Sequence, residues 1–576
     1  MNPVQQLLTE NIGLWSCADT AKKTGRGRAS GSAGTVYGIK KLRELILELA
    51  VRGKLVPQDP SDEPANALLG RIRKEKERQI LDGKIKKDKP IAAISDGEKP
   101  FALPQGWEWT RLGDVAYSQA GFSFKSNGFN ESGAGLPLVR IRDVGQTFTG
   151  TYFDGEYRDE FIVVKNDYLI SMDGEFRVAK WVNGKALLNQ RVSRLIFFGE
   201  ETVASFIAET LQFQLRKLQG VKAYTTVDHL SGGQISKSIF AFPPLAEQYR
   251  IVAKVDELMV LCDQLENDHV EVVDAHEKLV SHLLATLTAS QESADFSASW
   301  QRISAHFDML FTTEASIDTL KQTLLQLAVM GKLLPQDPCD EPASTLLERI
   351  QAEKAKLVFE GKIKKDKPLA AISDDEKPFE LPQGWSWARF PELGEFGRGK
   401  SKHRPRNDPK LFSPGIYPLV QTGEVARANK VINEYHSKYS EIGLAQSKIW
   451  PIGTLCITIA ANIADSALLG FDACFPDSVV GFVPYGPLDT SEYFLYFMKT
   501  ARRNLLKFAP ATAQKNINLE ILESILIPIP PLKEIFRIVA KVDELMALCD
   551  RMKTRIADAS AMQLKLADVM VAQAVA

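Results

Sequence analysis

This sequence is poor in the residues that build metal centres, disulfide frameworks and membrane spans. Only six cysteines occur in 576 residues and none forms a CxxC pair, so neither a zinc site nor a set of disulfides is expected. Seven histidines are present but no HExxH motif, and we predict no metal ligands. No run of about 18 uncharged apolar residues occurs, and the first residues, MNPVQQLLTEN, lack the basic and apolar regions of a signal peptide. We therefore expect a soluble protein that stays in the cytoplasm.

An excess of charge of either sign is also missing. Lysine and arginine number 71 against 72 aspartates and glutamates, for a formal net charge of −1. A protein coated with basic surface for indiscriminate nucleic-acid binding is thereby disfavoured. Basic residues do gather locally, as in KSKHRPR from Lys400 to Arg406.

What the sequence does contain is a long internal repeat. Residues 39–109 return as residues 317–387 without insertion or deletion, and roughly two-thirds of the aligned positions agree. A shorter repeat, FPPLAEQYRIVAKVDELMVLCDQL from Phe242, returns as IPPLKEIFRIVAKVDELMALCDRM from Ile529. The chain is a duplicated unit whose order is constant, variable, constant.

The repeats predict the domain organisation. The segments are an N-terminal helix with a flexible basic tether (1–38), a conserved helical repeat (39–110), a first variable domain (111–241), a central conserved helical region (242–388), a second variable domain (389–528) and a C-terminal conserved helix (529–576).

Apolar residues in the constant segments recur at intervals of three and four, which predicts helices that pack along a seam against other helices. We expect the terminal helices to meet near Leu42 and Val542, and Ser61 or Asp62 to cap the helix that follows them. The predicted seam consists of Leu42, Ile46, Leu49, Ile251, Val255, Leu258, Cys262, Leu320, Leu324, Leu327, Ile538, Val542, Leu545 and Cys549.

The variable segments have a different pattern. Short β-rich runs such as LPLVRIRDV from Leu136 and GTLCITIA from Gly453 alternate with Gly, Asp and Pro turns, and each segment ends in an amphipathic helix. The predicted fold class is α+β: two small mixed α/β domains joined by long antiparallel coiled-coil-like helices, with internal pseudo-twofold symmetry.

One motif suggests a nucleotide-binding enzyme. GEFGRGKS, from Gly394 to Ser401, satisfies the phosphate-loop pattern GxxxxGK[ST]. A phosphate loop must open a helix, however, and Pro405 and Pro409 in the following KHRPRNDP would break that helix. A basic loop that contacts DNA phosphates is the better interpretation. No DPPY or NPPY methylase motif and no GxGxxG occur, so no catalytic residues are predicted.

Side-chain chemistry and the alignment of the two variable segments suggest DNA contacts. Lys and Arg bind phosphates and guanine, Asn and Gln bind adenine, and Thr and aromatic residues add apolar contact. The candidates are Lys125, Arg177, Lys180, Tyr224, Thr225, Thr226 and His229 in the first segment, and Lys400, Lys402, His403, Arg404, Arg406, Gln514, Lys515, Asn516 and Asn518 in the second.

These motifs together resemble a known family. The NIGLWS and GRG segments, the duplicated LAVRGKLVPQDP and LPQGW motifs and PPLAEQYRIVAKVDEL are similar to the specificity subunit of type I restriction-modification systems, over nearly the full length. The N-terminal pattern resembles the subgroup with a long amino-terminal conserved region. One departure is PPLKEIF from Pro530, where Ile535 replaces Gln248 of the first copy.

The resemblance implies a non-catalytic subunit with two target recognition domains. Each would read half of an asymmetric double-stranded DNA target, while the helices set the spacer and hold two modification (methyltransferase) subunits. Restriction subunits, the translocase and endonuclease of the family, would join them. No cofactor is expected on this chain; S-adenosylmethionine, ATP and Mg²⁺ are expected on the partners. The alternatives are a stand-alone two-headed DNA-binding regulator, which would bind DNA tightly by itself, and a P-loop ATPase, which would need Lys400 to bind ATP.

Overall fold

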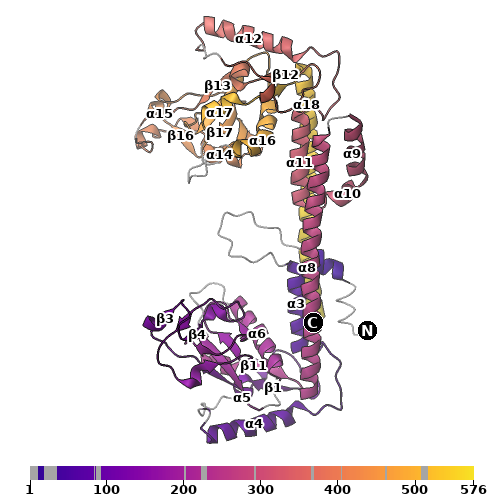
Figure 1. Ribbon diagram of the computed structural model, residues 1–576, viewed down its shortest axis with the longest axis vertical. Coiled ribbons are helices and arrows are strands. Elements are labelled where there is room, and N and C mark those ends of the chain that lie inside the picture. Colours follow the sequence, from indigo (N-terminus) through magenta and orange to yellow (C-terminus); the bar gives the residue numbers. More distant parts are fainter. Residues whose placement is uncertain are drawn as a thin grey trace. The chain divides into compact units, whose positions relative to one another are not determined.

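The computed structural model divides the chain into two compact units, each built from helices and one mixed domain (Figure 1). Unit 1 comprises Met1–Val273 and Asp558–Ala576, and unit 2 comprises Asp274–Ala557. The structure describes residues 11–17, 36–83, 85, 93–199, 203–221, 230–290, 293–364, 369–403, 405–460, 463–507 and 517–575. In this part of the chain, no helix is both long enough and apolar enough to cross a membrane.

Two long helices contribute to both units. Helix α8 (Leu245–Ala289) has 45 residues and α18 (Leu532–Val575) has 44. Unit 1 adds α2 (Ile12–Cys17), α3 (Tyr37–Val51) and α4 (Ala65–Leu81). Unit 2 adds α9 (Ser293–Ala305), α10 (Phe307–Leu310), α11 (Glu314–Val329) and α12 (Ala343–Phe359). The first copy of the long repeat thus forms α3 and α4, and the second forms α11 and α12.

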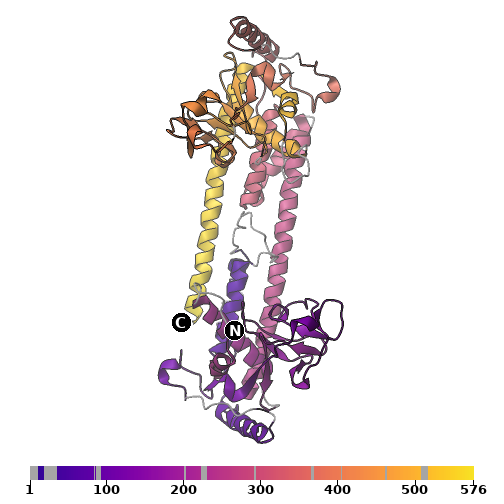
Figure 2. The same ribbon diagram turned by 90° about the vertical axis from the view of Figure 1, so that its left-hand side faces the viewer.

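In unit 1, α3 lies between α8 and the last turns of α18 (Figure 2). Arg43 of α3 donates to Asp263 of α8 (2.6 Å), and Tyr37 donates to Asp568 of α18 (2.7 Å). The expectation that the terminal helices meet near Leu42 and Val542 is wrong in its second residue. Leu42 shares an apolar cluster with Ala567, whereas Val542 packs in unit 2. The seam extends further along α18 than the repeated sequence does.

The predicted seam residues lie in apolar clusters of the two units. Thirteen of the fourteen predicted residues are buried, and the remaining one, Leu545, is half-buried. Full burial of an aliphatic side chain contributes roughly 1.5–3 kcal/mol, so these residues stabilise the packing of the helices. Cys262, Cys456, Cys474 and Cys549 are buried free thiols. Burial raises the pKa of the Cys262 thiol to about 11.

Domain 1, residues 108–242, begins with β1 (Glu108–Arg111) and ends with β11 (Ile239–Phe242), and these two strands pair antiparallel. Its central sheet has the order β2-β10-β7-β8. The strands are β2 (Ala116–Ala120), β10 (Val192–Phe197), β7 (Tyr168–Ser171) and β8 (Val178–Lys180). A second sheet of β3 (Phe129–Asn130), β5 (Tyr152–Phe153), β4 (Leu136–Val139), β9 (Ala186–Leu188) and β6 (Ile162–Val163) accompanies helices α5 (Leu112–Val115), α6 (Ala204–Val221) and α7 (Gly232–Lys237).

Domain 2, residues 386–529, has the same framework. Its end strands β12 (Ser386–Ala388) and β20 (Ile527–Ile529) pair, and its central sheet has the order β13-β19-β17-β18-β15. These strands are β13 (Gly394–Arg398), β19 (Val479–Pro484), β17 (Leu455–Thr458), β18 (Ser466–Leu469) and β15 (Val431–Ile432). The other elements are β14 (Tyr417–Leu419), β16 (Ser437–Tyr439), α13 (Phe390–Leu393), α14 (Thr422–Arg427), α15 (Glu441–Ala445), α16 (Glu492–Lys507) and α17 (Leu519–Ser524).

Strands β2, β10, β7 and β8 therefore correspond to β13, β19, β17 and β18, with every neighbouring pair antiparallel. The predicted α+β fold class, with one domain type that occurs twice and long antiparallel helices, is confirmed.

Most of the repeated motifs bind one another. In unit 1 the indole nitrogen of Trp107 donates to the carboxylate of Glu247 (2.9 Å), and Gln58 donates to its other oxygen (2.7 Å). In unit 2, Trp385 and Gln336 donate in the same way to Glu534 (3.0 and 3.4 Å). LPQGW, PQDP and PPLxE thus meet at one buried carboxylate in each unit, which clamps both ends of the domain onto the helices.

Asp62 belongs to this clamp as well. Its carboxylate accepts from Arg250 at 2.6 Å, and Asp340 and Arg537 repeat the pair in unit 2. The prediction that Ser61 or Asp62 caps the next helix is therefore wrong, because α4 begins at Ala65 with Pro64 in the capping position.

The glycine of the repeated AVxGKL motif is required by the same clamp. Gly53 has a φ of 67°, and a Cβ atom there would lie 2.6 Å from Pro104 and 2.8 Å from Trp107. Gly331 has a φ of 69° and meets the equivalent proline and tryptophan. A residue with a side chain is excluded by conformation and by space, since α3 and α11 both end in this left-handed turn.

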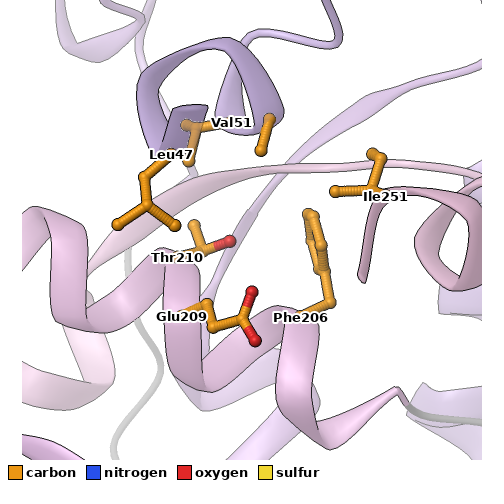
Figure 3. Close-up of a pocket in the computed structure, with 7 residues that line it drawn as sticks. Leu47, Val51, Phe206, Glu209, Thr210 and Ile251 are labelled. Carbon is orange, nitrogen blue, oxygen red and sulfur yellow. The ribbon is translucent and has the colours of Figure 1, made fainter. Parts of the chain in front are cut away.

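Each domain also packs on the helices through its own long helix, at contacts that we call junction 1 and junction 2. Junction 1 contains a small cavity between α3, α6 and α8 (Figure 3). Its lining consists of Leu47, Ala50, Val51, Phe206, Glu209, Thr210 and Ile251. Burial, together with the negative charge of Asp256 on α8, raises the pKa of Glu209 to about 7. Burial and both of these carboxyl groups also raise the pKa of Tyr168.

Junction 2 presents the equivalent helix carboxylate, Asp543, to different partners. Lys430 lies 2.8 Å from Asp543 and 2.8 Å from Glu492, and the Tyr496 hydroxyl donates to Asp543. Burial alone would lower the pKa of Lys430, but its hydrogen bonds to these two carboxylates raise it above the ordinary value. The two carboxylates of junction 2 thus share a cation.

Candidate nucleic-acid interface

Main-chain hydrogen bonds bring four segments of domain 1 together at one end of the central sheet. The amide of Leu230 donates to the carbonyl of Met172 (2.7 Å), and the amide of Met172 donates to the carbonyl of Arg191 (3.0 Å). The amide of Gly121 donates to the carbonyl of Val192 (2.9 Å). The end of β2, the β7–β8 turn, the β9–β10 turn and the start of α7 therefore form one surface, which we call face 1.

Domain 2 builds the equivalent face 2 from the same bonds. The amide of Ile517 donates to the carbonyl of Ile459 (3.0 Å), and the amide of Ile459 donates to Ser478 (3.0 Å). The amide of Gly399 donates to the carbonyl of Val479 (2.9 Å). The residues after β13, the β17–β18 turn and the start of α17 meet as their counterparts do in domain 1.

Two of the three described candidates of domain 1 lie on face 1. Lys125 is exposed in the segment that follows β2, and Arg177, in the β7–β8 turn, pairs with Glu175. Lys180 lies elsewhere: it pairs in register with Tyr168 at the far end of the β7–β8 ladder, with its ammonium group 5.5 Å from that ring. The strand direction separates Lys180 from the other two.

Face 2 carries most of the basic loop. Lys400 and Lys402 are exposed, and they have no carboxylate partner among the described residues. His403 is held in place, because its amide donates to Gln446 (2.8 Å) and its ring lies 2.8 Å from Asp408. The Lys410 amide and His403 lower the pKa of Asp408.

Arg406 pairs with Asp477 of the β18–β19 connection at 2.7 Å. The loop is thus attached to the sheet by charged partners and keeps Lys400 and Lys402 available for an anion.

Asn518 serves a structural purpose as well. Its carbonyl oxygen accepts from the amide of Ile521 (2.9 Å), so the side chain caps α17. Ser231 caps α7 in the same way in domain 1. The remaining candidates, Tyr224, Thr225, Thr226, His229, Arg404, Gln514, Lys515 and Asn516, lie outside the described residues.

The phosphate-loop pattern does not form a phosphate loop. Gly394–Arg398 is strand β13, which pairs antiparallel with β19. In the described residues after Lys400 no α-helix begins before α14 at Thr422. The sequence lacks the helix N-terminus that would bind phosphates. Across the residues that the structure describes, no group of three or more His, Cys, Asp or Glu could hold a metal ion.

Three exposed residues on these faces were not predicted from the sequence. Arg191 lies in the β9–β10 turn and pairs with Asp173 (2.8 Å), Arg398 ends β13 beside the basic loop, and Phe122 follows β2. Arg398 stands within GEFGRGKS and could have been included on charge alone. The other two needed the strand pairing, which the sequence does not reveal.

Comparison with known proteins identifies the family. A family model described as the type I restriction modification DNA specificity domain matches residues 104–274 and 382–558. The chain is 39% identical to the EcoEI specificity subunit of Escherichia coli, over 98% of this chain and 99% of that protein. It is 37% identical to the EcoAI specificity subunit of the same organism, with the same coverage.

Solved structures give more distant matches. A structure of a type I R-M system covers 83% of this chain and 99% of its own, with 18% identity and a TM-score of 0.45. The HsdS subunit from Thermoanaerobacter tengcongensis covers 83% and 98%, with 17% identity and a TM-score of 0.41. The family model matches more than half of the chain, and the two curated relatives match nearly all of it. The chain belongs to the family of type I restriction-modification specificity subunits.

Proposed function

We propose that this chain is the non-catalytic DNA-recognition subunit of a type I restriction-modification complex, in which each domain reads one half of an asymmetric bipartite target. The observation that carries the proposal is that face 1 and face 2 are equivalent in their main-chain structure. The same main-chain bonds build both faces, yet different side chains cover them. Two equivalent frameworks with different side-chain contacts suit two dissimilar half-sites.

The chemistry of the faces suits double-stranded DNA. Exposed lysines such as Lys125, Lys400 and Lys402 are available for phosphates, which position a protein on the duplex without reading sequence. The sequence before each helix cap, residues 222–229 and 511–516, contains Thr, Asn and Gln, which are residue types that bind base edges. These contacts are the proposed source of specificity.

The helices are proposed to set the spacer and to hold partner subunits. Both α8 and α18 contribute residues to both units, so their lengths constrain the two domains together. Two modification subunits would bind the helical regions that the chain carries twice, with restriction subunits joining them. S-adenosylmethionine, ATP and Mg²⁺ would be bound by those partners.

A domain exchange tests the division of labour. Residues 112–238, which join β1 to β11, are replaced by the corresponding segment of a relative with another target, because this boundary leaves the β1–β11 pair intact. Methylated adenines are then mapped in cells that contain the modification subunits. We expect one half-site to change while the other half-site and the spacer stay the same. A changed spacer with both half-sites preserved would refute the assignment.

The spacer has its own test. One helical turn inserted at Val273–Asp274 of α8, together with one turn at Ala557–Asp558 of α18, falls at the boundaries between the units. A turn adds about 5.4 Å, or about one and a half base-pair steps at 3.4 Å each. The double insertion should lengthen the spacer by one or two base pairs. The single insertions are the controls, because each shifts only one of two helices.

A further inference from the structure

Face 1 exposes an aromatic side chain beside its basic residues. Phe122 follows the end of β2 by two residues, and the residue is 38% exposed. The Phe122 amide donates to the carbonyl of Leu188, and its carbonyl accepts from the amide of Gln190, each at 2.9 Å. The main chain of Phe122 is therefore fixed next to the β9–β10 turn that carries Arg191.

The ring is supported from the protein side. Its centroid lies 5.3 Å from that of Phe124 and 5.2 Å from that of Phe161, and the Arg158 guanidinium lies 5.9 Å from it. Such contacts hold a ring in one orientation. An arginine stacked on an aromatic ring is likewise oriented while it keeps its charge.

The segment that carries Arg158 and Phe161 is anchored as well. Gln119 of β2 and Arg194 of β10 both donate to the carbonyl of Glu160, at 2.9 and 3.1 Å. The central sheet thus holds the support of the Phe122 ring, and the exposed edge of the ring is presented by a rigid framework.

The equivalent position in domain 2 has different chemistry. Gly121 and Gly399 occupy matching places after β2 and β13, and a Cβ at either would lie 2.1 Å from a carbonyl oxygen, of Asn189 and Phe475 respectively. The next residues are Phe122 and Lys400. A partner protein that binds both domains alike would need the same side chain twice. A difference at this position is expected where the two domains read different sequences.

We propose that Phe122 makes an apolar contact with a base of the half-site that domain 1 reads, with Arg158 held over its ring as the adjoining cation. The inference rests on the proposed function. An aromatic ring contacts duplex DNA in two ways: it packs on a thymine methyl group in the major groove, or it inserts between neighbouring base pairs. In domain 2, Lys400 replaces this contact with a charge for phosphate.

The test uses the complex of this chain with the modification subunits of its own system, and a duplex that carries the target mapped by methylation. Phe122→Ala should weaken binding to this duplex about tenfold or more, as expected for the loss of an aromatic contact to a base. The slope of log K against log salt should not change, because no charge is lost. Discrimination at the second half-site should also be unchanged.

Lys125→Gln is the matched control on the same face. It should weaken binding to all sequences and reduce the salt slope by about one. Phe122→Leu keeps apolar packing on Phe124 and Phe161 and should show a smaller loss than Phe122→Ala; it carries the test if the alanine variant does not assemble.

The outcomes separate the two proposals. If Lys125→Gln changes the salt slope while Phe122→Ala and Phe122→Leu bind within twofold of the unaltered chain, the inference about Phe122 is wrong and face 1 stands. If none of the three changes binding, face 1 itself is wrong. Deoxyuridine in place of each thymine of the first half-site removes only methyl groups. If this replacement weakens binding of the unaltered chain but not of Phe122→Ala, Phe122 contacts a thymine methyl group. If it does not weaken binding, and the fluorescence of 2-aminopurine placed in the half-site changes on binding only when Phe122 is present, the ring inserts between base pairs.

Discussion

Junction 1 and junction 2 contain equivalent helix carboxylates, but the variable domains place side chains of opposite charge beside them. Asp256 and Asp543 occupy one position of the repeated RIVAKVDEL motif. In junction 2 the variable domain supplies Lys430 and the Tyr496 hydroxyl to Asp543. In junction 1 the variable domain supplies Glu209, whose pKa is raised to about 7 by burial and by the nearby Asp256. One fixed carboxylate is therefore compensated in one unit and opposed in the other.

This difference shows which features of a variable domain the constant helices require. The clamp around Glu247 and Glu534 is repeated in full, so it accepts any domain that preserves its two end strands. The junctions are not repeated, because half of each comes from variable sequence. Each new domain must supply its own side chains beside the helix carboxylate, and the stability of a unit depends on those side chains.

The largest change is expected when junction 2 is made to resemble junction 1. Lys430→Glu places a third carboxylate beside Asp543 and Glu492 and removes their only shared cation among the described residues. We expect domain 2 to lose about 2–3 kcal/mol of stability, a figure reduced for partial exposure from the cost of breaking a buried ion pair. Hydrogen exchange of α16 peptides measures the loss, and Lys430→Arg, which keeps the charge, is the control. Equal protection in Lys430→Glu would show that the cation contributes nothing.

A smaller change in the opposite direction is expected in junction 1. Because the folded-state pKa of Glu209 is raised from 4.5 to about 7, its stabilising contribution is complete below pH 4.5 and is lost as the pH rises through 7. Domain 1 should therefore become more stable as the pH falls from 8 towards 5.

Glu209→Gln removes this dependence. At pH 8 it should stabilise domain 1 by about 1–2 kcal/mol, below the full value of the pKa shift because the site is partly exposed. Hydrogen exchange of α3 and α6 peptides at pH 6 and pH 8, corrected for the intrinsic exchange rate, measures both effects. Domain 2 provides the internal control in the same sample. A variant with the pH slope of the unaltered chain would exclude Glu209 as its source.

The smallest effects should come from the part of the comparison in which the units agree. Trp107→Phe and Trp385→Phe each remove one donor to a buried glutamate and keep most of the ring, at an expected cost of about 1 kcal/mol each. The two losses, measured by the same exchange experiment in their own units, should be equal within error. Unequal losses would show that the repeated clamps differ in strength.

The sequence predicted the helices and the repeated framework well, because a helix seam has a period that can be counted. Leu42, Ile251 and Ile538 were placed in apolar cores by spacing alone, and they are buried there. The β-rich character of the variable domains was also visible, as in β4 and β17.

Contacts between distant segments could not be predicted. Lys180 was grouped with Arg177 because both are basic and near in sequence, but the β7–β8 hairpin sends them to different ends of a ladder. Asp62 was predicted to cap a helix, but it instead pairs with Arg250, which lies far along the chain. Phe122 had no sequence signal, since its exposure depends on the strands that surround it.

Main-chain atoms hold the reading faces in place, and this has an evolutionary consequence. The bonds that join Gly121 to Val192 and Gly399 to Val479 do not involve side chains, and the two glycines exclude any larger residue. The side chains displayed next to them can be replaced without loss of the supporting geometry. A lineage could thus acquire a new DNA target sequence by a few substitutions, while the surfaces that bind its partner subunits stay unchanged.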